Sequence, residues 1–111
     1  MAWLNRQIQQ LWWRSRLDAL AEEIADRVFE SLWYRVGDRV VGMSFAESRG
    51  YTRVMAVAEL NRQASMSLSW MELPSCWQPQ LVALANDQVA VRIAQRAEAI
   101  ARYSKSVRRV A

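Results

Sequence analysis

Four carboxylates recur at every fourth position in the first third of the chain, where they could do chemistry together. They are Asp18, Glu22, Asp26 and Glu30, and we call them the acidic row. Clustered carboxylate oxygens bind hard cations such as Ca²⁺, so a metal site is one interpretation. The row drifts away from the apolar stripe of the same segment, however, which favours a face turned towards solvent. We therefore predict no metal and no cofactor.

Like charges four residues apart on a helix repel one another by about a few tenths of a kcal/mol. A cationic group near the acidic row would relieve this repulsion. Arg92 and Arg96 flank the apolar stripe of the last segment, and we predict that at least one of them lies within ion-pair reach of the row. A basic partner protein is the alternative source of positive charge.

Nucleophilic catalysis has little support in this composition. The sequence contains no histidine and a single cysteine, Cys76. A Cys–His nucleophile pair and the Glu-x-x-His motif of di-iron bundles are therefore excluded. No Gly-rich phosphate loop, zinc-ligand spacing or nucleophile elbow occurs. We predict that the protein is not an enzyme. Cys76 is expected to be a small packed residue beside Trp77, with a reactive surface thiol as the alternative.

Apolar residues at steps of three or four predict three long amphipathic helices, over about residues 3–35, 44–73 and 78–103. Gly37 suits the left-handed position that follows a helix end. Ser44 and Glu47 form a capping-box sequence at the start of the second helix, and Pro74 ends that helix. Gly50 either weakens the second helix or allows another helix to approach it closely.

Four segments need a separate prediction, and some of them have two possible structures. Ser15 with Asp18 is a possible N-cap, so the first helix is either continuous or broken near Ser15. Residues 65–70 alternate polar and apolar, which is compatible with a strand as well as a helix. Ser75 with Gln78 is a possible capping box before the third helix, or Pro79 is the first residue of that helix. Residues 104–111 lack the stripe and are predicted to be a frayed basic tail.

Together these elements predict a single all-α domain over residues 1–111, built as an elongated bundle. Three stripes must bury one another, which predicts the core Leu17, Leu20, Ile24, Val28, Val57, Leu60, Leu68, Val89, Ile93 and Ile100. Several aromatic residues of the first segment lie off these stripes. Covering them requires self-association, so we predict a homo-oligomer, most simply a homodimer. The predicted interaction surface is Trp3, Trp12, Trp13, Phe29, Trp33 and Tyr34.

The function that this pattern favours is a small protein-interaction or scaffold module acting as a homo-oligomer. Two alternatives are also compatible with the sequence, which has a net charge of +4. All of its basic residues are arginines except Lys105. Basic residues near both ends of the chain are compatible with nucleic-acid binding. The N-terminal Trp/Arg segment is compatible with binding to a membrane surface. We see neither a signal peptide nor an apolar run long enough to span a bilayer, and expect a cytoplasmic protein.

Overall fold

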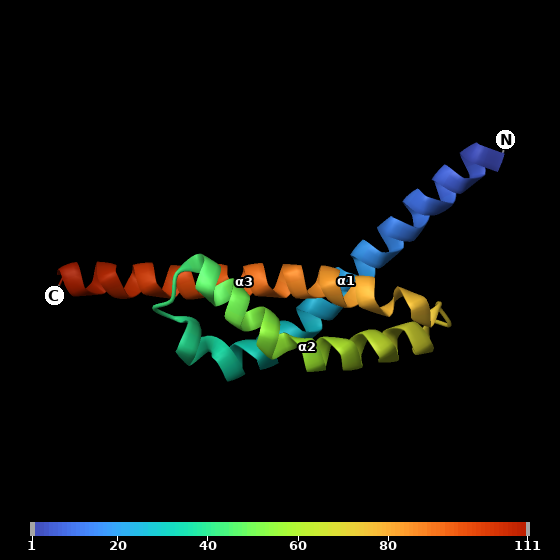
Figure 1. The fold of residues 1–111 in the computed structure, drawn as a ribbon. Coiled ribbons are helices and arrows are strands. Elements are labelled where there is room, and N and C mark those ends of the chain that lie inside the picture. The colour runs from blue at the N-terminus through green and yellow to red at the C-terminus, as the bar shows by residue number, and fades with distance from the viewer. Residues whose placement is uncertain (1, 111) are drawn as a thin grey trace.

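A computed structural model describes residues 2–110 of the chain, with side chains described for residues 2–107. Three long helices, α1 (Ala2–Val40), α2 (Phe45–Trp70) and α3 (Gln78–Val110), pack against one another, and a short 3₁₀ turn, η1 (Ser75–Trp77), precedes α3. No strand occurs in this part of the chain. The molecule measures 67 × 27 × 18 Å. This all-α, elongated bundle confirms the predicted fold class (Figure 1).

Helix α1 is continuous and longer than predicted. It runs through Ser15 without a break and ends at Val40, five residues beyond the expected end. Gly37 does not end the helix: it is buried inside it, and a Cβ added there would lie 3.0 Å from the Trp33 ring. The chain turns at Gly42 instead, whose φ of +103° is readily available only to glycine.

Helix α2 begins with the predicted capping box. The Ser44 Oγ accepts from the Glu47 N–H, and the Glu47 carboxylate accepts from the Ser44 N–H. Residues 65–70 are helical, so the strand interpretation is wrong. The helix ends at Trp70, three residues before the predicted end, because Glu72 takes a positive φ of 56°. The N–H of Leu73 then donates to the Leu68 carbonyl, as in a Schellman motif.

The core contains eight of the ten predicted residues, but Val57 and Ile100 are exposed at 44% and 38%. The error for Val57 arises because α2 buries a stripe of mostly small residues, Ser48, Thr52, Ala56, Leu60, Ala64 and Leu68. Small side chains let neighbouring helices approach closely, whereas the larger Val54 and Val57 face outward. Gly50 takes no part in such an approach, since nothing lies within 4 Å of a Cβ added there.

The core stops short of both chain ends. Its first residue on α1 is Leu17 and its last on α3 is Ala97. Ile100 lies beyond this limit, which explains its exposure. Helix α3 continues to Val110, beyond its predicted end at about residue 103, so residues 104–110 of the predicted tail are helical. Residue 111 of that tail lies outside the described residues. Figure 1 shows the start of α1 and the end of α3 extending in different directions from the packed region.

The connection between α2 and α3 differs from the predicted capping box. No side chain caps η1, and α3 begins at Gln78. The Gln78 side-chain amide donates across to the Asn61 backbone carbonyl of α2 at 3.3 Å. Cys76 is exposed, which contradicts the expectation of a packed residue. It lies in η1, while the neighbouring Trp77 packs against the core.

Candidate functional site

The first fifteen described residues of α1 expose several large apolar side chains. We call residues 2–16 the N-terminal arm; all of them except Trp13 are exposed. Leu4, Ile8 and Leu11 are spaced by four and three residues, so they lie on one face of the helix. The exposed fractions of the large arm side chains are 69% for Trp3, 54% for Leu4, 59% for Ile8, 68% for Leu11 and 59% for Trp12.

Trp13 anchors the base of the arm to the bundle. Its ring meets the Trp77 ring edge to face, with 5.4 Å between the centroids and an angle of 87°. Both residues pack against the hydrophobic core. Such aromatic pairs contribute about 0.5–1.5 kcal/mol beyond the area they bury. Trp13 was predicted to be part of the interaction surface, but in the protomer it already has a partner in η1.

Phe29 and Trp33 also make contacts within the protomer. The guanidinium of Arg96 on α3 lies 5.0 Å from the Phe29 ring centroid and 5.2 Å from that of Trp33. Both aromatic residues are partly buried against the core. Tyr34 differs from them, because it is 89% exposed. The predicted surface therefore divides: Trp3 and Trp12 are both exposed on the arm but lie on opposite sides of its helix, and Tyr34 lies outside the arm.

The acidic row faces solvent and meets both arginines named from the sequence. Arg92 forms an ion pair with Asp26, and Arg96 Nη1 lies 3.3 Å from Glu30 Oε1. The predicted contact between α1 and α3 is therefore present. Exposed pairs of this kind contribute about 0.2–1 kcal/mol each. The two other members of the row are exposed and have no ion pair within the described residues.

Other polar contacts between side chains were not predicted from the sequence. Arg53 pairs with Asp87, thirty-four residues away, and links α2 to α3. No local sequence pattern predicts a contact between residues so far apart in the chain. Glu59 and Arg62 are neighbours on one turn of α2, with 2.7 Å between Arg62 Nη2 and Glu59 Oε1. The hydrogen bonds from Arg62 lower the pKa of Glu59 below its ordinary value.

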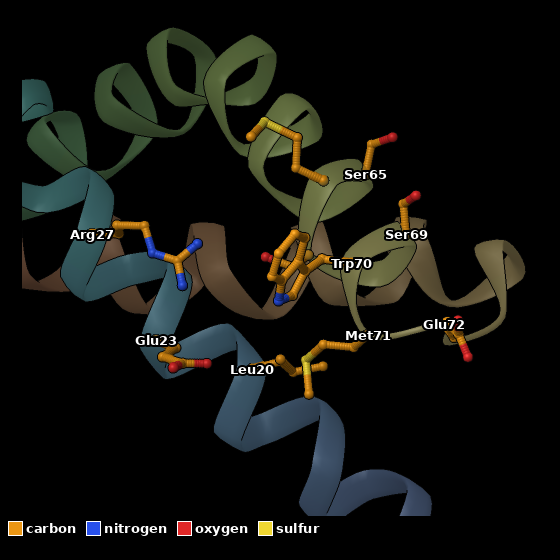
Figure 2. Close-up of a pocket in the computed structure, with 10 residues that line it drawn as sticks. Leu20, Glu23, Arg27, Ser65, Ser69, Trp70, Met71 and Glu72 are labelled. Atoms are coloured by element: carbon orange, nitrogen blue, oxygen red, sulfur yellow. The ribbon is translucent and has the colours of Figure 1, made fainter.

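An open groove that the sequence did not predict lies between the middle of α1 and the end of α2. Its volume is about 960 Å³. Figure 2 shows Leu20, Glu23 and Arg27 on the α1 wall, with Trp70 projecting from the opposite side. The α2 side adds Met66, Met71 and Glu72. We call this feature the α1–α2 groove.

Trp70 is the main exposed apolar residue of the groove, with 89% of its surface open to solvent. Met66 lies one turn before it and is 56% exposed. Their spacing of four residues was a usable signal, because it places both side chains on one helical face away from Leu68. The polar–apolar alternation of residues 65–70 obscured that signal by suggesting a strand.

The basic residues do not form one continuous patch. Arg14 and Arg16 lie on the arm, whereas Arg102 and Lys105 lie in the C-terminal part of α3. The start of α1 and the end of α3 are far apart (Figure 1). Arg102 is paired with Glu98. The side chains of Arg108 and Arg109, two further basic residues near the chain end, lie outside the described part.

Two findings concern membranes and metals. No helix within residues 2–110 has the length and apolar character needed to cross a membrane. Over the same described residues, no group of three or more His, Cys, Asp or Glu side chains is arranged to hold a metal ion.

The site is therefore an apolar arm beside an open groove on a helical bundle. Comparison with known proteins found no matching protein family, no matching curated protein and no matching solved structure.

Proposed function

We propose that this protein is a small interaction module that acts as a homo-oligomer and associates through its N-terminal arm. The observation that carries the proposal is the arm itself, a helix that extends beyond the core with its large apolar side chains exposed. Contiguous apolar surface of this kind is typical of protein or membrane interaction sites.

Energetic considerations support a partner for the arm. A helix of about fifteen residues is marginally stable in water when nothing packs against it. Each large apolar side chain that becomes fully covered contributes about 1.5–3 kcal/mol. Covering Leu4, Ile8 and Leu11, which share one face of the helix, therefore contributes favourable free energy that offsets part of the cost of association.

The test is the mass in solution, measured by light scattering across a range of protein concentrations. We expect wild type to be at least dimeric at high micromolar concentration, and the triple variant Leu4→Ala/Ile8→Ala/Leu11→Ala to shift towards monomer. The matched control is Val54→Ala, which removes an apolar side chain that is 75% exposed on α2. It should leave the mass unchanged. A wild-type protein that is monomeric at these concentrations contradicts the proposal.

Binding to a membrane surface is the second candidate, and the charge of the arm favours it. The arm contains Arg6, Arg14 and Arg16 and no acidic residue. Helices that lie on membranes combine basic residues with Trp and Leu in this way. Co-sedimentation with anionic vesicles, but not with neutral ones, would support this candidate. Nucleic-acid binding that weakens steeply with salt would instead support the nucleic-acid-binding alternative named from the sequence.

A further inference from the structure

The α1–α2 groove has a composition complementary to that of the arm. Its apolar part is Leu20, Met66, Trp70 and Met71, and its acidic members are Glu23 and Glu72. Arg27 is its one cationic member. Neither Glu23 nor Glu72 forms an ion pair within the described residues. The arm offers the opposite pattern, an apolar face and three arginines without any acidic residue.

An arm cannot enter the groove of its own protomer. The α1 wall of the groove begins at Leu20, about one turn beyond the end of the arm, and both belong to one uninterrupted helix. Folding the arm back would break α1 near Arg16 and lose helical hydrogen bonds. The arm of a second copy has no such restriction, because it belongs to a different chain.

We infer that the arm of one protomer occupies the α1–α2 groove of a second copy, and that the exchange is reciprocal. This inference rests on the proposed self-association and adds its geometry. A two-fold axis near Arg16 places the two α1 helices antiparallel, so that each arm runs beside residues 20–27 of its partner. Two identical contacts then form at once and close the assembly as a dimer.

The distribution of charge favours the same antiparallel pairing of arm and groove. In this antiparallel arrangement the arm of one copy, which has no acidic residue, runs past the partner's Glu23, an exposed carboxylate that lines the groove. A parallel pairing of two arms would instead bring like charges together. Opposite charge across an interface favours the correct register and disfavours the other one.

Disulfide trapping tests the geometry directly. Cys76 is exposed and is first replaced by Cys76→Ser. Ile8→Cys and Met66→Cys are then introduced on separate chains, which are mixed, allowed to exchange and oxidised. We expect the mixed disulfide between the two variants to exceed the product of either variant alone. Ile8→Cys dimers as the main product would show that arms pack on arms and would overturn the inference.

Trp70 provides a second measurement with a closely matched control. Trp70 and Tyr34 are both 89% exposed, but Tyr34 lies outside the groove. Buried tryptophans are frequent hot spots of association. Trp70→Ala should weaken dimerisation by about tenfold or more, and Tyr34→Ala should have little effect.

The outcomes separate the two proposals. If wild type dimerises but Trp70→Ala does not weaken the dimer, or if no mixed disulfide forms, the arm–groove contact is wrong and self-association still stands. If wild type is monomeric at every concentration, both proposals fail. Dimerisation that depends on the arm and on Trp70, with the mixed disulfide as the main product, supports both.

Discussion

At the scale of single residues, the two glycines inside helices occupy opposite environments. A Cβ added at Gly50 meets nothing within 4 Å, whereas one added at Gly37 lies 3.0–3.2 Å from the Trp33 ring. Replacing glycine by alanine in a helix interior gains about 0.5–1 kcal/mol when space allows. The same substitution therefore has different consequences at the two positions.

We predict that Gly50→Ala raises the free energy of unfolding by about 0.5–1 kcal/mol. Gly37→Ala should give no such gain, because the Trp33 ring must move and its stacking on Arg96 is disturbed. Denaturant unfolding of both variants with an unchanged m-value would measure the difference. Equal stabilisation by the two substitutions would show that the Trp33 contact does not restrain this position.

Local sequence signals explain why some residues were predicted correctly. The Ser44–Glu47 capping box depends on residues three apart, and it is present as predicted. The role of Gly37 was wrong because a glycine can serve a turn or a close contact, and only the position of Trp33 distinguishes the two. The α1–α2 groove was not predictable at this scale, since it forms only when α1 and α2 meet.

At the scale of elements, the end of α2 contains a strained residue that can be tested. Glu72 has a positive φ of 56° in the left-handed position of a Schellman motif, where glycine is usual. The N–H groups of Glu72 and Leu73 bond back to Ser69 and Leu68, which holds the conformation. Side chains other than Gly cost about 1–2 kcal/mol there.

Glu72→Gly should therefore stabilise the bundle by about 0.5–1 kcal/mol, since glycine adopts this conformation without the steric cost but has more freedom when unfolded. Thermal and urea unfolding would measure the change. The control is Glu98→Gly within α3, which should destabilise because glycine lowers helix propensity. Destabilisation by Glu72→Gly would mean that the Glu72 side chain makes a contact that outweighs the strain.

The packing of α3 against α1 depends unequally on its two arginines. Arg96 contacts Glu30 and both the Phe29 and Trp33 rings, whereas Arg92 contacts Asp26. We predict that Arg96→Ala destabilises by about 1–2 kcal/mol, because it removes an ion pair and two ring contacts. Arg92→Ala should cost less than about 1 kcal/mol. The reverse order in chemical unfolding would contradict the assigned role of the aromatic contacts.

The helical stripes predicted α1 and α3 better than α2, for a physical reason. Large aliphatic residues such as Leu17, Ile24 and Ile93 make the buried face visible in the sequence. On α2 the buried face contains Ser48, Thr52 and Ala56, which look no more apolar than the rest of the helix. Hydrophobicity alone therefore assigned Val57 to the core, although close helix packing selected the small residues.

At the scale of the whole molecule, the arm and the bundle are separable. The core begins at Leu17, and among the described side chains the ring contact at the base of the arm is that of Trp13 with Trp77. A chain that begins at Trp13 keeps this contact and the whole core. It lacks the exposed face of Leu4, Ile8 and Leu11 together with Trp3 and Trp12.

This truncation makes folding and association respond differently. In dilute solution, where the full chain is monomeric, we predict that both chains unfold within about 5 °C of each other, because little buried area is lost. At high concentration the full chain should gain thermal stability by mass action, while the truncated chain should not. Calorimetry over a hundredfold range of concentration measures both effects. A truncated chain whose midpoint still rises with concentration would place the association surface on the bundle, and one that does not fold would make the arm part of the core.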